Sequence, residues 1–180
     1  MLRSWPIALL CFTIVPADIA AQYDATHPVA VLAGYSVAVG QSASGRGLQL
    51  GGRVILPATA WLGVRFDVGY MYFAGGTYII DYVDGSSATQ QASLKVLSAS
   101  ASVTVLDPPS VKRRISWIAG LGLYHVNDSQ DGSRYTSPGW NAGMCIPISK
   151  SVSLDLRYHG LIRPTGTQGF VPISLGVRLL

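Results

Sequence analysis

Apolar side chains alternate with polar or very small ones, with a period of two residues, in eight segments of this 180-residue chain. Successive side chains of a β-strand point to opposite faces, so each segment predicts a strand with one apolar and one polar face. The segments are residues 28–39, 46–56, 61–73, 94–106, 115–126, 139–148, 152–162 and 170–180. They predict an all-β fold, an eight-stranded antiparallel up-and-down transmembrane β-barrel, because closing the sheet removes its exposed edges.

Composition narrows the class of protein. Charged residues make up 12% of the chain, about half of the roughly 25% that is usual in soluble domains. The apolar content excludes a disordered chain, and the interruption of every apolar run after the N-terminus excludes a helical membrane protein. The net charge of +4 comes from scattered basic residues, so the sequence gives no support for nucleic-acid binding.

The first residues are typical of a secretory signal. Arg3 provides the positive start, residues 5–15 the apolar core, and Ala20 and Ala21 the small residues before a cleavage site. This predicts a signal peptide at residues 1–21 and a barrel domain at residues 22–180. Cleavage would leave Cys145 as the one thiol, which excludes an intrachain disulfide and a cysteine-based zinc site.

The predicted connections alternate in length. Short ones fall at residues 57–60, 107–114 and 149–151, and mostly longer ones at 40–45, 74–93, 127–138 and 163–169. Outer-membrane barrels have short periplasmic turns and longer extracellular loops, so the first set is predicted to be periplasmic. Within 74–93, residues 77–83 read as strand continuing above the bilayer. Residues 74–93 and 127–138 are therefore the predicted contact regions for a possible extracellular partner.

The polar face decides what the apolar face meets. A water-facing sheet would carry Lys, Glu and Thr at most polar positions, but here the polar face is mainly Gly, Ser, Asn and Gln. Small residues suit a narrow lumen, so the apolar face is predicted to meet outer-membrane lipid. Aromatic residues near strand ends, typical of the membrane interface, are Tyr70, Tyr72, Trp117 and Trp140. The alternative is a soluble periplasmic ligand-binding barrel.

Six charges lie on the inward face, all in the predicted periplasmic half: Arg53, Arg65, Asp67, Asp155, Arg157 and Arg178. An unpaired charge in a narrow lumen is costly, so these residues are expected to form a network. Four arginines and two aspartates leave two positive charges in excess. One hypothesis is a lumen closed by this network, without a continuous pore. The alternative is a set of charges that hydrate trapped water.

Catalytic chemistry has little support. His125 falls in the apolar row and His159 in the polar row, so their side chains are expected on opposite faces of the wall. His125-Val-Asn-Asp lacks the serine of the His-x-Ser-Asn pattern of lipid A deacylases. The loop at 127–132 lacks the final acid of a calcium loop. We predict no catalytic residue, no metal site and no cofactor, with a lipid-modifying enzyme as the alternative.

The whole predicted mature chain resembles the small eight-stranded outer-membrane barrels of Gram-negative bacteria, of the OmpA and OmpX type. The features that carry the resemblance are the signal peptide, the alternation of connection lengths and the last strand, Pro172–Leu180. In that family the last strand is recognised by the barrel-insertion machinery and usually ends in an aromatic residue, whose place Leu180 takes. The resemblance implies an integral outer-membrane protein with a structural or surface-interaction role and an interior salt-bridge cluster.

Overall fold

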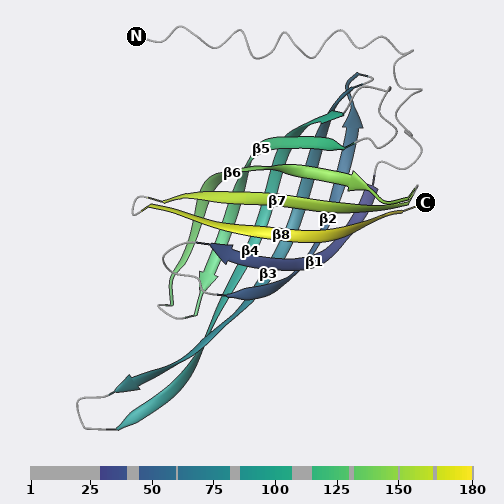
Figure 1. The fold of residues 1–180 in the computed structure, drawn as a ribbon. Helices are drawn as coiled ribbons and strands as arrows, with labels where there is room; N and C mark the ends of the chain where they lie inside the picture. The colour runs from purple at the N-terminus through teal and green to yellow at the C-terminus, as the bar shows by residue number, and fades with distance from the viewer. Residues whose placement is uncertain are drawn as a thin grey trace, which may run out of the picture.

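The computed structural model describes residues 29–39, 45–59, 61–81, 86–106, 115–129, 132–149, 151–163 and 166–179, and they form a closed barrel. The strands are β1 (Val29–Val39), β2 (Arg46–Pro57), β3 (Leu62–Asp81), β4 (Ser87–Leu106), β5 (Ser116–Asp128), β6 (Arg134–Pro147), β7 (Val152–Arg163) and β8 (Gly166–Arg178). Each strand pairs antiparallel with the next, and β8 pairs with β1 (Figure 1). The predicted all-β, eight-stranded up-and-down barrel is confirmed. The predicted signal peptide at 1–21 and the connection at 107–114 lie outside the described residues.

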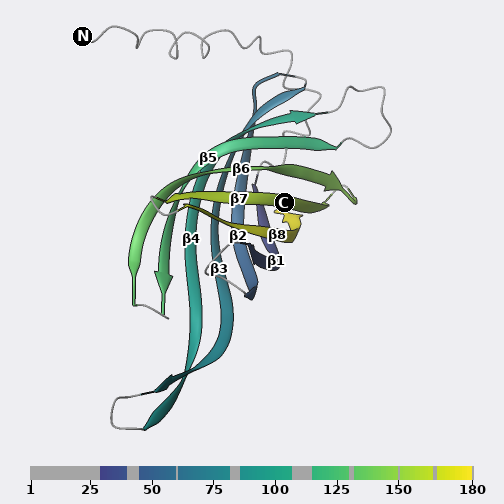
Figure 2. The ribbon, with the colours of Figure 1, turned by 60° about the vertical axis from the view of Figure 1, so that its left-hand side comes forward.

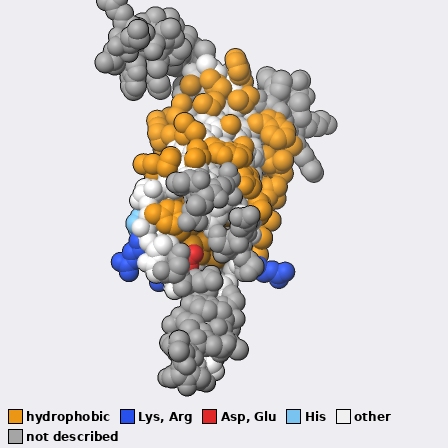
Figure 3. All heavy atoms as spheres, turned by 90° about the vertical axis from the view of Figure 1, so that its left-hand side faces the viewer, with side chains coloured by type: hydrophobic (Ala, Val, Ile, Leu, Met, Phe, Trp, Pro, Cys, Tyr) orange, Lys and Arg blue, Asp and Glu red, His pale blue; other side chains and the backbone are white. Residues whose placement is uncertain are grey.

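The alternation seen in the sequence sets which side chains face outward. On β4, Leu97 and Val103 are about half exposed, whereas Ser102 and Thr104 between and beside them are buried. The same pattern holds on β8, where Leu175 is exposed and Ser174 is buried. The outward rows join into a broad hydrophobic surface around the barrel (Figure 3). None of the described residues forms a helix long and apolar enough to cross a bilayer.

Small residues on the inward face let the strands close into a narrow tube. A Cβ atom added to Gly34 on β1 would overlap the carbonyl oxygen of Ile173 and lie 2.7 Å from Ser174 Oγ on β8. A Cβ atom at Gly143 on β6 would overlap the backbone of β7 at Leu156. Side chains at these two positions would push neighbouring strands apart. The predicted use of small residues to fill a narrow lumen therefore has a direct steric basis.

Strands β3 and β4 are 20 residues long and project beyond the other strands as a hairpin (Figures 1 and 2). A register shift between Ala74 and Thr77 separates the barrel part from the projecting part, which ends at the Asp81–Ser87 pair. The prediction that the strand continues beyond Thr77 is confirmed as far as Asp81. Residues 82–85 lie outside the described residues.

The predicted loops at 74–93, 127–138 and 163–169 are wrong in extent, because much of each is strand. β5 runs to Asp128 and β6 begins at Arg134, while β7 runs to Arg163 and β8 begins at Gly166. Backbone hydrogen bonding between strands does not require an apolar outward face. The pairing therefore continues past the point where apolar alternation ends, and that point was taken as the strand boundary.

Candidate functional site

The turn-end half of the lumen holds a cluster of five buried charged side chains, here called the charge cluster: Arg53, Arg65, Asp67, Asp155 and Arg157. Their inward positions on β2, β3 and β7 bring together residues far apart in the chain. Arg53 and Asp67 are direct cross-strand partners. Asp155 and Arg157 reach the cluster from β7 on the other side of the lumen.

Asp155 contacts all three arginines of the charge cluster. Its Oδ2 accepts from Arg65 Nη1 at 2.6 Å and from Arg53 Nη1 at 3.3 Å, and its Oδ1 accepts from Arg157 Nε at 2.7 Å. With 2% of its surface exposed, this carboxylate is removed from water. Three guanidinium groups therefore replace its hydration.

Asp67 is the second bridge of the charge cluster. Its carboxylate accepts from Arg65 Nε at 2.8 Å and Nη2 at 2.7 Å, and from Arg157 Nη1 at 3.0 Å. The two arginines are thus each shared between both aspartates. Charge-assisted bonds of this kind are roughly twice as strong as neutral ones.

The predicted sixth charge, Arg178, is not brought into the cluster. It occupies the last inward position of β8, is partly exposed, and forms no ion pair with any other described residue. The charge cluster therefore has three arginines and two aspartates, one positive charge in excess. Neutral acceptors also surround Arg53, which donates to Ser153 Oγ at 2.7 Å and lies 3.4 Å from Cys145 Sγ.

Next to the charge cluster the lumen is polar but uncharged. The Tyr124 hydroxyl and His159 Nδ1 are 2.9 Å apart, and the imidazole stacks on Phe170 with ring centroids 5.3 Å apart. Ser102 donates to the side-chain oxygen of Asn141 at 3.0 Å. His159 is thus a buried hydrogen-bonding side chain inside the barrel.

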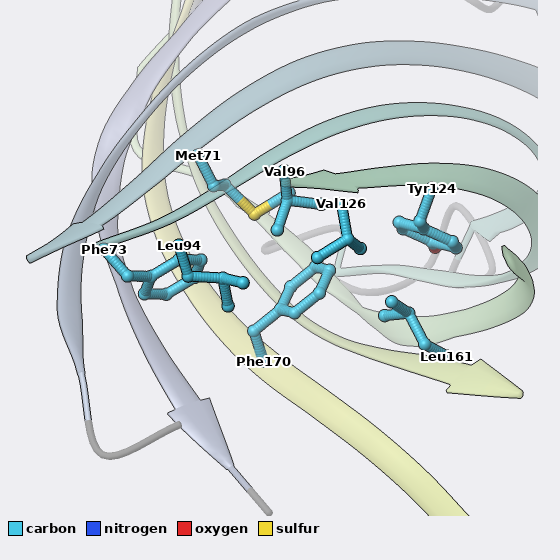
Figure 4. Packing of buried hydrophobic residues seen from close by; sticks show 8 residues of the cluster. All are labelled: Met71, Phe73, Leu94, Val96, Tyr124, Val126, Leu161 and Phe170. Carbon is cyan, nitrogen blue, oxygen red and sulfur yellow. The ribbon is translucent and has the colours of Figure 1, made fainter. Parts of the chain in front are cut away.

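The loop-end half of the lumen is apolar, which the sequence analysis missed. Eight buried side chains point toward one another inside the barrel (Figure 4): Met71, Phe73, Leu94, Val96, Tyr124, Val126, Leu161 and Phe170. The signal that could have found them is the inward row of 61–73, which passes from Arg65 and Asp67 to Met71 and Phe73. An inward row need not be polar throughout, because nothing but side chains fills so narrow a lumen.

The four predicted interface aromatics all lie on the outward face, with exposed fractions from 39% for Trp140 to 51% for Trp117. Trp117 is the second residue of β5, at the turn end. Tyr72 stands opposite Leu48, near the loop-end start of β2, and Tyr70 stands one outward position further into the barrel, opposite Leu50. Trp140 is one pair from the loop end of the β6–β7 ladder.

The two histidines lie on opposite faces of the wall, as their registers predict. His125 is exposed on the outer face, where its Nδ1 is 3.0 Å from Thr136 Oγ1. His159 is buried in the lumen, so the two side chains do not share a site. Within the described part of the chain, no three His, Cys, Asp or Glu side chains gather where they could hold a metal ion.

The closed antiparallel strands, the apolar outer wall and the filled lumen define a small eight-stranded transmembrane β-barrel. Two solved structures have this fold: Ail, the attachment invasion locus protein of Yersinia pestis, crystallised with the heparin analogue sucrose octasulfate, and Neisserial surface protein A. Ail is 16% identical, with a TM-score of 0.53 over 84% of this chain and 97% of Ail. Neisserial surface protein A is 19% identical, with a TM-score of 0.54 over 84% and 94% of the two chains. No family model and no curated protein sequence matches this chain.

Proposed function

We propose that this chain is an integral protein of a bacterial outer membrane, exported by a cleaved signal peptide at residues 1–21, with a structural or surface-interaction role. The outer wall supports the membrane location, since Leu48, Val68 and Leu121 leave 60–71% or so of their surface exposed in the absence of lipid. The likeness to Ail and Neisserial surface protein A supports the same environment through the fold. Outer-membrane lipids and, during assembly, the barrel-insertion machinery are the partners this location implies.

The lumen is closed in this proposal. The charge cluster occupies its turn-end half, and Phe170 and its apolar neighbours occupy the other half. Arg65 and Tyr124, one in each layer, have no exposed surface. A hydrated ion would have to displace both layers. Closure also argues against a transport role and leaves the outer surface as the place where this protein acts.

The observation that carries the surface role is the projecting β3–β4 hairpin. Its strands pair only with each other beyond Ala74 and Ser93 among the described residues, so both of its edges carry unpaired backbone groups. Unpaired strand edges can bond an extended segment of another protein. The regions 74–93 and 127–138 are thus the proposed contact surface for an extracellular partner. That Ail was crystallised with a heparin analogue shows that a barrel of this fold can bind an external ligand.

The surface role is tested by replacing residues 75–92 with an Asn-Gly turn, which keeps the Ala74–Ser93 pair and removes the projecting part. Cells with the complete or the shortened protein are compared for adherence to epithelial monolayers and to immobilised matrix proteins. The amount of folded barrel is matched by the gel mobility of unboiled samples. We expect the shortened protein to lose adherence. Equal adherence at equal amounts would refute a surface role for the hairpin.

Catalysis does not enter this proposal. The alternative, a lipid-modifying barrel enzyme, requires a histidine beside an acid or a serine at the rim. His125 has Thr136 as its hydroxyl neighbour, and His159 bonds Tyr124 inside the lumen. Loss of a lipid A modification on replacing His125 would favour the enzyme.

A further inference from the structure

The outer face changes from apolar to basic toward the hairpin end of the barrel. Along β4 the outward row runs from Lys95 through Leu97 to Ala99 and Ala101, and Lys95 is exposed. Along β6 it begins at Arg134, which is also exposed. Lys and Arg side chains accordingly show at the hairpin-side end of the hydrophobic surface in Figure 3.

The strand register places these two basic residues around one polar residue. Asn127 of β5 is the direct partner of Lys95 on β4 and of Arg134 on β6. Neighbouring strands are about 4.8 Å apart, so the Cα atoms of Lys95 and Arg134 are about 10 Å apart, within reach of one bound group. Tyr72 stands opposite Lys95 on the other side. Tyr72, Lys95, Asn127 and Arg134 are here called the basic row.

No acid shares the outward face with the basic row in the described strands beside it. Asp128 follows Asn127 directly, but it is the partner of buried Leu94 and belongs to the inward row. The outward neighbours of Asn127 along β5 and β6 are His125 and Thr136, which are uncharged or weakly basic. The basic row is therefore suited to a negatively charged group.

An apolar groove of about 700 Å³ opens on the outer wall on the membrane side of the basic row. Ala99 and Ala101 of β4 line it between larger side chains: Phe66 and Val68 on β3, and Leu121 and Leu123 on β5. The groove continues the same strands as the basic row, because Lys95 and Ala99 are four residues apart on β4, about 13 Å at 3.3 Å per residue.

We propose that the basic row and this groove together bind one phosphate-bearing lipid of the outer leaflet, with the phosphate on Lys95 and Arg134 and an acyl chain in the groove. A cation pair at the end of an apolar groove matches the charge and polarity of such a lipid from head to tail. A soluble anion would have no use for the groove. A second copy of this chain would bring two basic rows into an apolar interface. The site is independent of the projecting hairpin.

The test uses purified barrel in detergent and two probes: lipid A with both phosphates, and the same lipid with its phosphates removed. Binding is measured by native mass spectrometry and by titration. We expect the phosphorylated lipid to bind better, and K95Q/R134Q to weaken its binding about tenfold, as the loss of two charge-assisted contacts predicts. K95R/R134K should keep the binding. R46Q is the matched control, because Arg46 is an exposed arginine on β2 at the same end but outside the basic row.

A second variant tests the groove. A101F should fill it and weaken both lipids, without affecting the fold that the mobility of unboiled samples reports. Equal binding of the two lipids, or equal loss in R46Q and K95Q/R134Q, would overturn the phosphate site. Unchanged binding in A101F, or a change in oligomeric state instead of lipid binding, would overturn the groove as the acyl-chain site.

Discussion

Replacing Asp155 with Asn is expected to destabilise the barrel by about 3–5 kcal/mol, the usual cost of removing one partner from a buried ion pair. Asp155 accepts hydrogen bonds from Arg53, Arg65 and Arg157 at 2.6–3.3 Å. The amide keeps one oxygen acceptor but removes the charge. The excess positive charge of the charge cluster then rises from one to two, with 2% of Asp155 exposed to offset it by hydration.

Two further variants separate charge from ordinary hydrogen bonding. Ser153→Ala removes the neutral acceptor 2.7 Å from Arg53 Nη2 and should cost about 1.5 kcal/mol, the value for a bond to a charged group. Adding Arg53→Met to Asp155→Asn returns the excess charge to one. The double variant should therefore be less destabilised than the sum of the two single variants, which a double-mutant cycle measures directly.

The free energy of unfolding is obtained from urea titration of protein folded into lipid vesicles, followed by tryptophan fluorescence. A loss below about 1 kcal/mol for Asp155→Asn, the scale of an exposed ion pair, would refute the reasoning. Additive effects of Asp155→Asn and Arg53→Met would also contradict it, because they would mean that the two side chains do not share a charge balance.

Three more predictions follow from the lumen and the orientation. Phe170→Ala should cost about 3–5 kcal/mol by the same titration, because the ring is 2% exposed in a packed lumen, and a loss as small as that of Leu121→Ala on the outer wall would contradict this packing. Planar-bilayer recordings of the pure protein should show no steady, ion-selective openings, and such openings would exclude the closed lumen. In a Cys145→Ser background, a membrane-impermeant maleimide added to intact cells should label Thr89→Cys on the hairpin but not Ser149→Cys at the opposite end, and the reverse pattern would invert the orientation.

The strand faces could be predicted from the sequence because each side chain on a strand has one of two directions. Leu97 and Ser98 differ in polarity, and this difference reports which one faces lipid. The alternation is local, so no long-range information is needed to find it. It also placed Arg65 and Asp155 inside the same half of the barrel, although 90 residues separate them in the chain.

The filling of the lumen could not be predicted in the same way. Which inward residues touch depends on the relative height of all strands, which a single strand does not reveal. Arg178 shares the inward face with Arg157, yet it lies at the rim and is partly exposed. Phe170 and Met71 come from opposite ends of the chain and meet only once the barrel closes. The lengths of β3 and β4 were also missed, since alternation marks where lipid ends and not where pairing ends.

The most direct test of the central claim, a closed barrel embedded in the outer membrane, is membrane fractionation combined with gel mobility before and after boiling. The barrel should be in the outer-membrane fraction, resist extraction without detergent, and migrate differently in unboiled and boiled samples. A soluble protein with the same mobility in both samples would contradict the membrane barrel and favour a soluble periplasmic one.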